Sequence, residues 1–170
     1  RQALAIMKHE NIARVFDAGQ TVEGLPYFVM ELVKGLPITK FCDESKLTIK
    51  ERLELFEKVC SAIQHAHQKG IIHRDIKPAN VMLVPDAVAP GGERVKLLDF
   101  GIAKLTDDQG KGGIKTATHQ VIGTPAYMSP EQCAGAGGVD ARTDVYALGC
   151  VLYELLTGRT PFVAEGAGRL

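Results

Sequence analysis

The sequence of 170 residues predicts one domain of mixed α+β class. Three observations lead to this prediction. Two strand-like runs lie on either side of a glycine turn near the N-terminus, at residues 12–19 and 26–33. A long amphipathic helix is expected at residues 48–70, with two more short strands after it. Near the C-terminus lies a helix that is apolar on nearly all sides, and such a helix belongs in the middle of a domain.

The elements of the first half follow from local patterns. RQALAIM has helical periodicity and predicts the end of a helix. IARVFDAG and PYFVMELV are separated by QTVEGL, in which Gly24 predicts the turn of a hairpin. Thr48 and Glu51 form a capping box at the start of the long helix, and Gly70 is placed to end it in a left-handed conformation. The predicted buried stripe of this helix is Ile49, Leu53, Phe56, Cys60, Ile63 and His67.

The second half begins with two short strands, VML and VKLL, joined by the turn VPDAVAPGGER. Residues 99–132 are polar and rich in Gly and Thr, without a sustained period. A loop of this length inside a compact domain is usually functional or mobile. Thr143 is expected to cap the apolar helix, which Gly158 and Pro161 end.

The composition is that of a globular protein, and the charge balance does not favour nucleic acid or an anionic membrane as partner. Hydrophobic residues make up 45% and charged residues 24% of the chain. Lys plus Arg and Asp plus Glu are 20 each, so no net field favours nucleic acid or an anionic membrane. No apolar run approaches the roughly 20 residues of a membrane span, and the first residues do not form a signal peptide. The four cysteines lack C-x-x-C spacing, which favours free thiols in a reducing cytosol.

A polar cluster occupies GIIHRDIKPANVML, residues 70–83. Asn80 lies on this loop and Asp99 follows the strand VKLL, so two strand ends can bring these residues to one point. Amide and carboxylate oxygens suit Mg²⁺, which is usually held by one or two protein oxygens plus substrate phosphates. Lys77 adds positive charge where a phosphoryl group is transferred, and Asp75 remains as a base for a hydroxyl proton. The cluster therefore predicts phosphoryl transfer.

These motifs carry a family resemblance. HRDIKPAN resembles the catalytic loop of eukaryotic-type protein kinases, DFG resembles their magnesium-binding motif and SPE their A-P-E motif, in the right order. YFVMELV resembles the hinge strand, and DVYALGCVLYELLTGRTPF the central helix of the large lobe. The motifs are most similar to those of bacterial Hanks-type serine/threonine kinases. The resemblance implies a protein-kinase-like fold, with the end of helix C, strands 4 and 5 and the hinge of the small lobe at residues 1–33, and part of a mostly helical large lobe at 34–170.

The resemblance implies transfer of phosphate from ATP to Ser or Thr of proteins, with Mg²⁺ or, in its place, Mn²⁺. The implied catalytic residues are Asp75 as base, Lys77 as the γ-phosphate contact, Asn80 and Asp99 as metal ligands, and Thr124 as a bridge to Asp75 and Lys77. The implied adenine pocket consists of Met30 as gatekeeper, Glu31 and Val33 through their backbones, and Met82 as the floor.

Other positions are implied in regulation. Arg74 would pair with a phosphate on Thr116 or Thr118, because guanidinium binds phosphate through two hydrogen bonds. The remaining implied residues are the hydrophobic spine of His73, Phe100, Leu4 and Val15, then Gly101 of DFG, Glu131 of SPE, and Asp144 as anchor of the catalytic loop. The implied partners are protein substrates, ATP and a second kinase copy for autophosphorylation in trans, without nucleic acid or a membrane segment in this chain. The expected location is the cytoplasm, with any membrane anchor outside this stretch.

Parts of the family pattern are missing from the sequence. Kinases hold the ATP phosphates with a Gly-rich loop, a strand Lys and a Glu on a helix, and none of these is found here. The Glu would fall immediately before Arg1, and Pro37 stands near the usual position of a ribose-binding carboxylate. We therefore expect a catalytic-domain fragment, truncated at both ends and inactive by itself.

Other interpretations stay open. The chain could be a pseudokinase that serves as a scaffold, or a small-molecule phosphotransferase with a kinase-like core, although the latter has no need of the segment GTPAYMSPE. His65 and His67 could be a metal pair, but positions two apart on a helix face different directions. Ordinary loop or core roles are the alternative for Thr116, Thr118, Met30 and Met82.

Overall fold

A computed structural model describes residues 7–100, 125–134 and 139–162 of the chain. The chain divides into two compact units, which are described separately. Unit 1 is Arg1–Ile71 with Pro78–Leu98, and unit 2 is Ile72–Lys77 with Asp99–Leu170. The two units are defined by their compactness and need not coincide with the two expected lobes. The lobe boundary expected after residue 33 therefore stays a prediction. The N-terminal helix end expected at residues 1–7 lies almost wholly outside the described residues.

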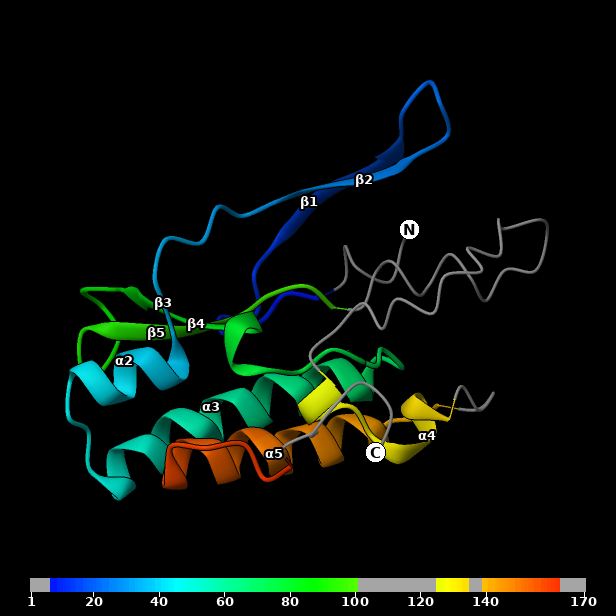
Figure 1. Ribbon diagram of the computed structural model, residues 1–170. Coiled ribbons are helices and arrows are strands. Elements are labelled where there is room, and N and C mark those ends of the chain that lie inside the picture. Colours follow the sequence, from blue (N-terminus) through cyan, green and yellow to red (C-terminus); the bar gives the residue numbers. More distant parts are fainter. Residues whose placement is uncertain (1–6, 101–124, 135–138, 163–170) are drawn as a thin grey trace. The chain divides into compact units, whose positions relative to one another are not determined.

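The predicted N-terminal hairpin is confirmed in unit 1. Strands β1 (Val15–Gln20) and β2 (Pro26–Met30) pair antiparallel, and both are shorter than the sequence pattern suggested (Figure 1). Gly24 has a φ of 83°, and the Gly24 N–H donates to the Thr21 carbonyl at 2.9 Å, which closes the turn. A left-handed φ costs glycine nothing because it lacks a Cβ.

The second sheet of unit 1 has the strand order β3-β4-β5 (Figure 1). Strands β4 (Val81–Pro85) and β5 (Glu93–Leu97) form the second predicted hairpin, paired from Val81 opposite Leu97 to Pro85 opposite Glu93. The two-residue strand β3 (Leu36–Pro37) pairs with β4 and leads directly into helix α2 (Ile38–Glu44). Sequence reasoning missed β3 and α2, because neither is long enough to show a period.

The long helix α3 (Ile49–Gln68) is confirmed, as is its capping box. The Thr48 N–H donates to Glu51 Oε2 at 2.7 Å, and the Glu51 N–H donates to Thr48 Oγ1 at 3.4 Å. Gly70 follows the helix with a φ of 72°, the left-handed conformation that its position predicts. The helix packs against β5, while α2 packs against β4.

The predicted buried stripe of α3 is wrong at Ile49 and Leu53, and three of its other positions, Phe56, Cys60 and His67, are only half-buried. Ile49 and Leu53 are 64% and 42% exposed, and only Ile63 of the predicted set is fully buried. The residues that α3 buries are Val59, Ala62, Ile63 and Ala66. Two of these are alanines, which let neighbouring elements approach the helix closely. A pattern search that follows large apolar side chains overlooks such a face.

In unit 2, the short helix α4 (Pro130–Cys133) precedes α5 (Arg142–Thr157), the predicted apolar helix (Figure 1). The prediction that Thr143 caps α5 is wrong. The helix begins at Arg142, two residues earlier than a Thr143 cap would imply, and the Arg142 N–H donates to Asp140 Oδ1 at 2.9 Å. Thr143 instead lies in the first turn, fully buried, and its hydroxyl is hydrogen-bonded to that of Ser129. Gly158 ends the helix with a φ of 74°.

All four cysteines, Cys42, Cys60, Cys133 and Cys150, are free. Burial raises the pKa values of the Cys42, Cys60 and Cys150 thiols, which keeps these side chains uncharged. Across the described ranges, none of the helices combines the length and the apolar character that crossing a membrane requires.

Two histidine rings meet in unit 1, where the segment before β1 contacts α3. The His9 and His65 ring centroids lie 5.0 Å apart, and His9 Nδ1 accepts the Asn11 N–H at 3.1 Å. Nε2 of His65 is buried and has no hydrogen-bond partner among the described residues. Burial, and secondarily the charge that His65 would carry, lower the pKa of His9 below 6.5, and Glu10 opposes this shift.

We expect this contact to make the protein less stable in mild acid. The neutral form of His9 is favoured in the folded state, so its contribution is complete above pH 6.5 and is lost as pH falls through the lower folded-state pKa. His9→Gln should therefore reduce the loss of thermal stability between about pH 7.5 and about pH 5.5. The same loss in the variant and in the unaltered protein would contradict the expectation.

Candidate active site

The predicted site residues fall into two groups, one in each compact unit. Unit 2 contains the loop Ile72–Lys77 together with Asp99, Phe100 and Asp144. Unit 1 contains Asn80, the segment after β2 and Met82 of β4. Each group is built below from its own contacts.

The loop Ile72–Lys77 is hydrogen-bonded to helix α5 through the carboxylate of Asp144. The His73 N–H donates to Asp144 Oδ2 and the Arg74 N–H donates to Asp144 Oδ1, both at 2.8 Å. Asp144 is fully buried in the first turn of α5, where the positive end of the helix dipole favours a negative charge. Residues about 70 positions apart are thereby joined through charge-assisted hydrogen bonds.

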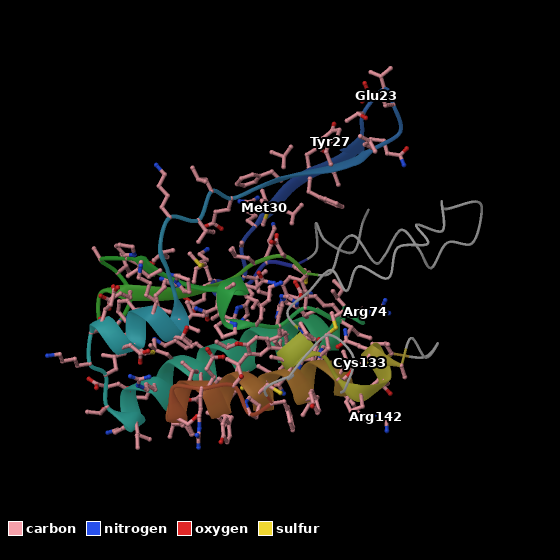
Figure 2. All side chains as sticks on the ribbon, in the orientation of Figure 1. Glu23, Tyr27, Met30, Arg74, Cys133 and Arg142 are labelled. Atoms are coloured by element: carbon pink, nitrogen blue, oxygen red, sulfur yellow. The ribbon has the colours of Figure 1, made fainter. Side chains whose placement is uncertain are left out.

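Arg74, labelled in Figure 2, has a strained backbone conformation, and hydrogen bonds from two other segments hold it in place. Its φ of 64° is uncommon for a residue with a side chain and costs about 1–3 kcal/mol. Asp144 accepts the Arg74 N–H, and Gln132 Nε2 donates to the Arg74 carbonyl at 2.8 Å. Both peptide groups of Arg74 are therefore fixed, one by α5 and the other by α4.

Gln132 is a site residue that sequence reasoning missed. Its Oε1 accepts the Ser129 N–H at 3.1 Å, which completes a capping box at α4, while its Nε2 donates to the carbonyl of Arg74 in the loop Ile72–Lys77. The S-x-x-Q spacing of SPEQ is a capping-box signal in the sequence, and it could have identified the cap. The bond to Arg74 could not be read from the sequence, because it depends on tertiary contact.

Asp75 and Lys77 contact each other directly. Lys77 Nζ lies 2.9 Å from Asp75 Oδ2, and the two side chains are 22% and 37% exposed, so both are accessible to a substrate. The Asp75 N–H donates to His73 Nδ1 at 3.3 Å, so Nδ1 is the acceptor in this contact. A carboxylate beside an ammonium group can accept a proton next to a site that stabilises negative charge.

His73 also packs against the DFG segment. Its ring centroid lies 4.6 Å from that of Phe100, and both side chains are buried. Asp99, which precedes Phe100, has a φ of 47°, a second strained conformation in the same unit. Strained residues held by close packing cluster at functional sites. Of the expected spine, Val15 belongs to unit 1 and Leu4 lies outside the described residues.

The unit 1 group begins with Asn80, at the end of the 3₁₀ helix Pro78–Asn80. The side chain of Asn80 is buried. Its backbone carbonyl accepts the N–H of Leu98, the residue before Asp99, at 2.8 Å. This bond continues the β4–β5 ladder past Val81 and Leu97. Asn80 and Asp99 themselves belong to different units, so their convergence on one point stays a prediction.

Glu31 follows Met30 at the end of β2, in the predicted hinge (Figure 2). Its N–H donates to the Arg14 carbonyl at 2.8 Å, and its carboxylate accepts the Arg14 N–H at 3.1 Å and contacts Lys96 Nζ at 2.9 Å. Partial burial would raise the pKa of Glu31, but the Arg14 N–H and Lys96 outweigh it, so the pKa lies below its ordinary value. The Glu31 carboxylate is thus engaged by Arg14 and Lys96 of the same chain. Met82 and Val33 are half-buried.

Besides Leu4, four predicted residues lie outside the described residues: Gly101, Thr116, Thr118 and Thr124. Glu131 lies in α4 and is half-buried. Across the described ranges, no three or more His, Cys, Asp or Glu side chains gather into one cluster, so His65 and His67 belong to no such cluster there.

Comparison with known proteins identifies the family. A sequence model of the protein kinase domain matches residues 1–169. The chain is 45% identical over 168 residues to the serine/threonine-protein kinase PknB of Mycobacterium tuberculosis, a match covering 96% of this chain and 25% of that protein. It is 44% identical over 169 residues to the serine/threonine-protein kinase Pkn1 of Myxococcus xanthus, covering 97% and 23% respectively. The chain thus spans about a quarter of the length of these curated relatives.

A solved structure resembles the fold. The crystal structure of a double mutant of the Mycobacterium tuberculosis PknI kinase domain has a TM-score of 0.71 and 31% sequence identity. The match covers 95% of this chain and 56% of that chain. The predicted α+β, kinase-like fold is therefore confirmed. Both its sequence and its fold place this chain in the protein kinase family.

Proposed function

We propose that the full-length protein transfers the γ-phosphoryl group of ATP to serine and threonine hydroxyls of other proteins. The observation that carries the proposal is the 2.9 Å contact between Lys77 and Asp75 on a loop whose backbone is fixed by buried Asp144. In the proposed reaction the acceptor hydroxyl oxygen forms the new bond to phosphorus, its proton passes to Asp75, and ADP leaves. Lys77 contacts the γ-phosphate, and Thr124 links the acceptor segment to the base.

The donor set of Asn80 and Asp99 suits Mg²⁺, because an amide and a carboxylate oxygen are hard ligands. When bound, Mg²⁺ or Mn²⁺ would neutralise charge on the ATP phosphates. Adenine would contact the backbones of Glu31 and Val33, beside Met30 and Met82. Since the Glu31 N–H already donates to Arg14, the adenine contact falls to the Glu31 carbonyl.

Regulation is proposed to act through the segment between the DFG and SPE motifs. A phosphate on Thr116 or Thr118 would bind Arg74, which directly precedes the base. Phe100 and Gly101 would set the position of the DFG segment, Glu131 would hold the SPE motif, and Asp144 would hold the catalytic loop. We further propose a cytoplasmic kinase domain whose substrates are proteins, including a second copy of itself phosphorylated in trans.

Metal removal and the choice of acceptor test the proposal. The full-length protein is incubated with Mg²⁺ and ATP, with either a Ser/Thr-containing protein or a set of small alcohols and amines. We expect phosphate in the protein acceptor, none after chelation of the metal, and recovery when Mg²⁺ returns. Transfer to small molecules alone would contradict the proposal and favour a small-molecule phosphotransferase, and ATP binding without any transfer would favour a scaffold.

A further inference from the structure

Helix α4 contacts the loop that contains the proposed base through the side chain of Gln132. Gln132 Nε2 donates to the Arg74 carbonyl at 2.8 Å, although the two residues lie 58 positions apart in the sequence. Figure 2 labels Arg74 on the loop and Cys133, the residue after Gln132, on α4. The Arg74 carbonyl belongs to the peptide group that joins Arg74 to Asp75. Gln132 therefore holds the peptide group that leads directly into the base.

This peptide group is hydrogen-bonded on both of its sides. The Asp75 N–H, which belongs to the same group, donates to His73 Nδ1 at 3.3 Å. A peptide group is planar, so bonds at its carbonyl and at its N–H together fix the orientation of the plane. The Cα atom of Asp75 lies in that plane, and its side chain extends from there. The bond from Gln132 thus bears on where the Asp75 carboxylate points.

The strained backbone of Arg74 makes this support necessary. Its φ of 64° is a conformation that persists only where the surrounding structure holds it. Asp144 accepts the Arg74 N–H at 2.8 Å on one side of the residue, and Gln132 donates to its carbonyl on the other. Loss of the bond from Gln132 would let Arg74 move toward an ordinary φ. That movement would rotate the peptide group that precedes Asp75.

Gln132 is itself fixed at the start of α4. Its Oε1 accepts the Ser129 N–H at 3.1 Å, so the side-chain amide cannot turn over without losing this bond and the bond to Arg74. The Ser129 side chain is fully buried, and its hydroxyl is hydrogen-bonded to that of Thr143 in the first turn of α5. The same turn contains Asp144. It therefore supports the loop twice, directly through Asp144 and indirectly through this chain of hydrogen bonds.

We propose that Gln132 is a positioning residue for the base Asp75, and that its side-chain amide holds the peptide group between Arg74 and Asp75 in the orientation that phosphoryl transfer requires. This role rests on the proposed function, because it assigns Gln132 a part in that reaction. Gln132 acts through the backbone of Arg74, whereas Asp75 and Lys77 act on the acceptor and the phosphate. The alternative is that Gln132 serves only as the cap of α4.

Two substitutions in the full-length protein separate positioning from capping. Gln132→Glu keeps an acceptor for the Ser129 N–H, because glutamate also completes a capping box, but a carboxylate has no proton to donate to the Arg74 carbonyl. Gln132→Met is similar in size, uncharged and without either bond. We expect kcat to fall about tenfold or more in both variants with the KM for ATP unchanged, because a misdirected base slows transfer without weakening nucleotide binding. The midpoint of thermal unfolding should fall further in Gln132→Met, which also loses the cap.

Gln64→Glu is the matched control, since Gln64 is an exposed glutamine of α3, and it should leave kcat unchanged. A kcat of Gln132→Glu equal to that of the control would overturn the proposal and leave Gln132 as a cap only. A fall in kcat confined to Gln132→Glu would also overturn it, because the added charge and not the lost bond would then be the cause.

Hydrogen exchange tests the same role without any measurement of activity. The Asp75 amide should exchange faster in both Gln132 variants than in the unaltered protein or in Gln64→Glu, because its peptide group has lost one of its two hydrogen bonds. Equal exchange in all four proteins would overturn the proposal. Absence of phosphate transfer by the unaltered protein would overturn the proposed function instead, and the exchange rates would still decide whether Gln132 orients this peptide group.

Discussion

Asp75→Asn in the full-length protein is expected to lower turnover by about two to four orders of magnitude while ATP binding survives. Asparagine keeps the shape of the side chain but cannot accept the hydroxyl proton. The Asp75 carboxylate contacts Lys77 at 2.9 Å, and in the proposed mechanism it acts on the acceptor and does not hold the nucleotide. Turnover is measured with a protein substrate, and ATP affinity by calorimetry.

Asp17→Asn is the matched control for this prediction. Asp17 lies exposed on β1, and its Oδ1 accepts the Ala18 N–H, a bond that an amide oxygen can also accept. We expect turnover and ATP affinity of this variant to stay as they are. Loss of ATP binding with unchanged turnover in Asp75→Asn would contradict the role of Asp75 as base.

Asp144→Asn is expected to lower the free energy of unfolding by about 2–3 kcal/mol and to reduce turnover with it. The fully buried carboxylate accepts two backbone N–H groups, those of His73 and Arg74. An amide has only one oxygen, so one buried N–H would face an NH₂ group and lose its partner. The strained φ of Arg74 would then be held on one side only, by Gln132.

Urea unfolding and hydrogen exchange of residues 72–77 check this expectation. The amides of His73 and Arg74 should exchange faster in Asp144→Asn, because their acceptor is weakened. Asp140→Asn is the control, since Asp140 is paired at the protein surface with Arg142 at the start of the same helix. Equal stability and equal exchange of the two variants would show that Asp144 does not anchor the loop.

Local signals in the sequence predicted the parts of the fold that local chemistry determines. The capping box of Thr48 and Glu51 set the start of α3, and Gly24 and Gly70 marked positions that adopt positive φ. The buried face of α3 could not be predicted in the same way. It includes Ala62 and Ala66, whose burial depends on how closely other elements approach and not on their own hydrophobicity.

The candidate site likewise contains features that the sequence predicts and features that depend on tertiary contacts. Motif order predicted the residues of the loop, because the sequence places a candidate base, a cation and an amide oxygen close together at Asp75, Lys77 and Asn80. The left-handed backbone of Arg74 and its bond to Gln132 were not predictable, since both arise from contacts with distant segments. The meeting of Asn80 with Asp99 and the roles of Thr116, Thr118 and Thr124 remain predictions.

Phosphoamino acid analysis tests the central claim most directly. The full-length protein and its Asp75→Asn variant are each incubated with γ-labelled ATP, Mg²⁺ and a protein that contains Ser, Thr and Tyr. The proposed mechanism predicts label in phosphoserine or phosphothreonine with the unaltered protein, and almost none with the variant. Label only in phosphotyrosine, or equal label with both proteins, would contradict it.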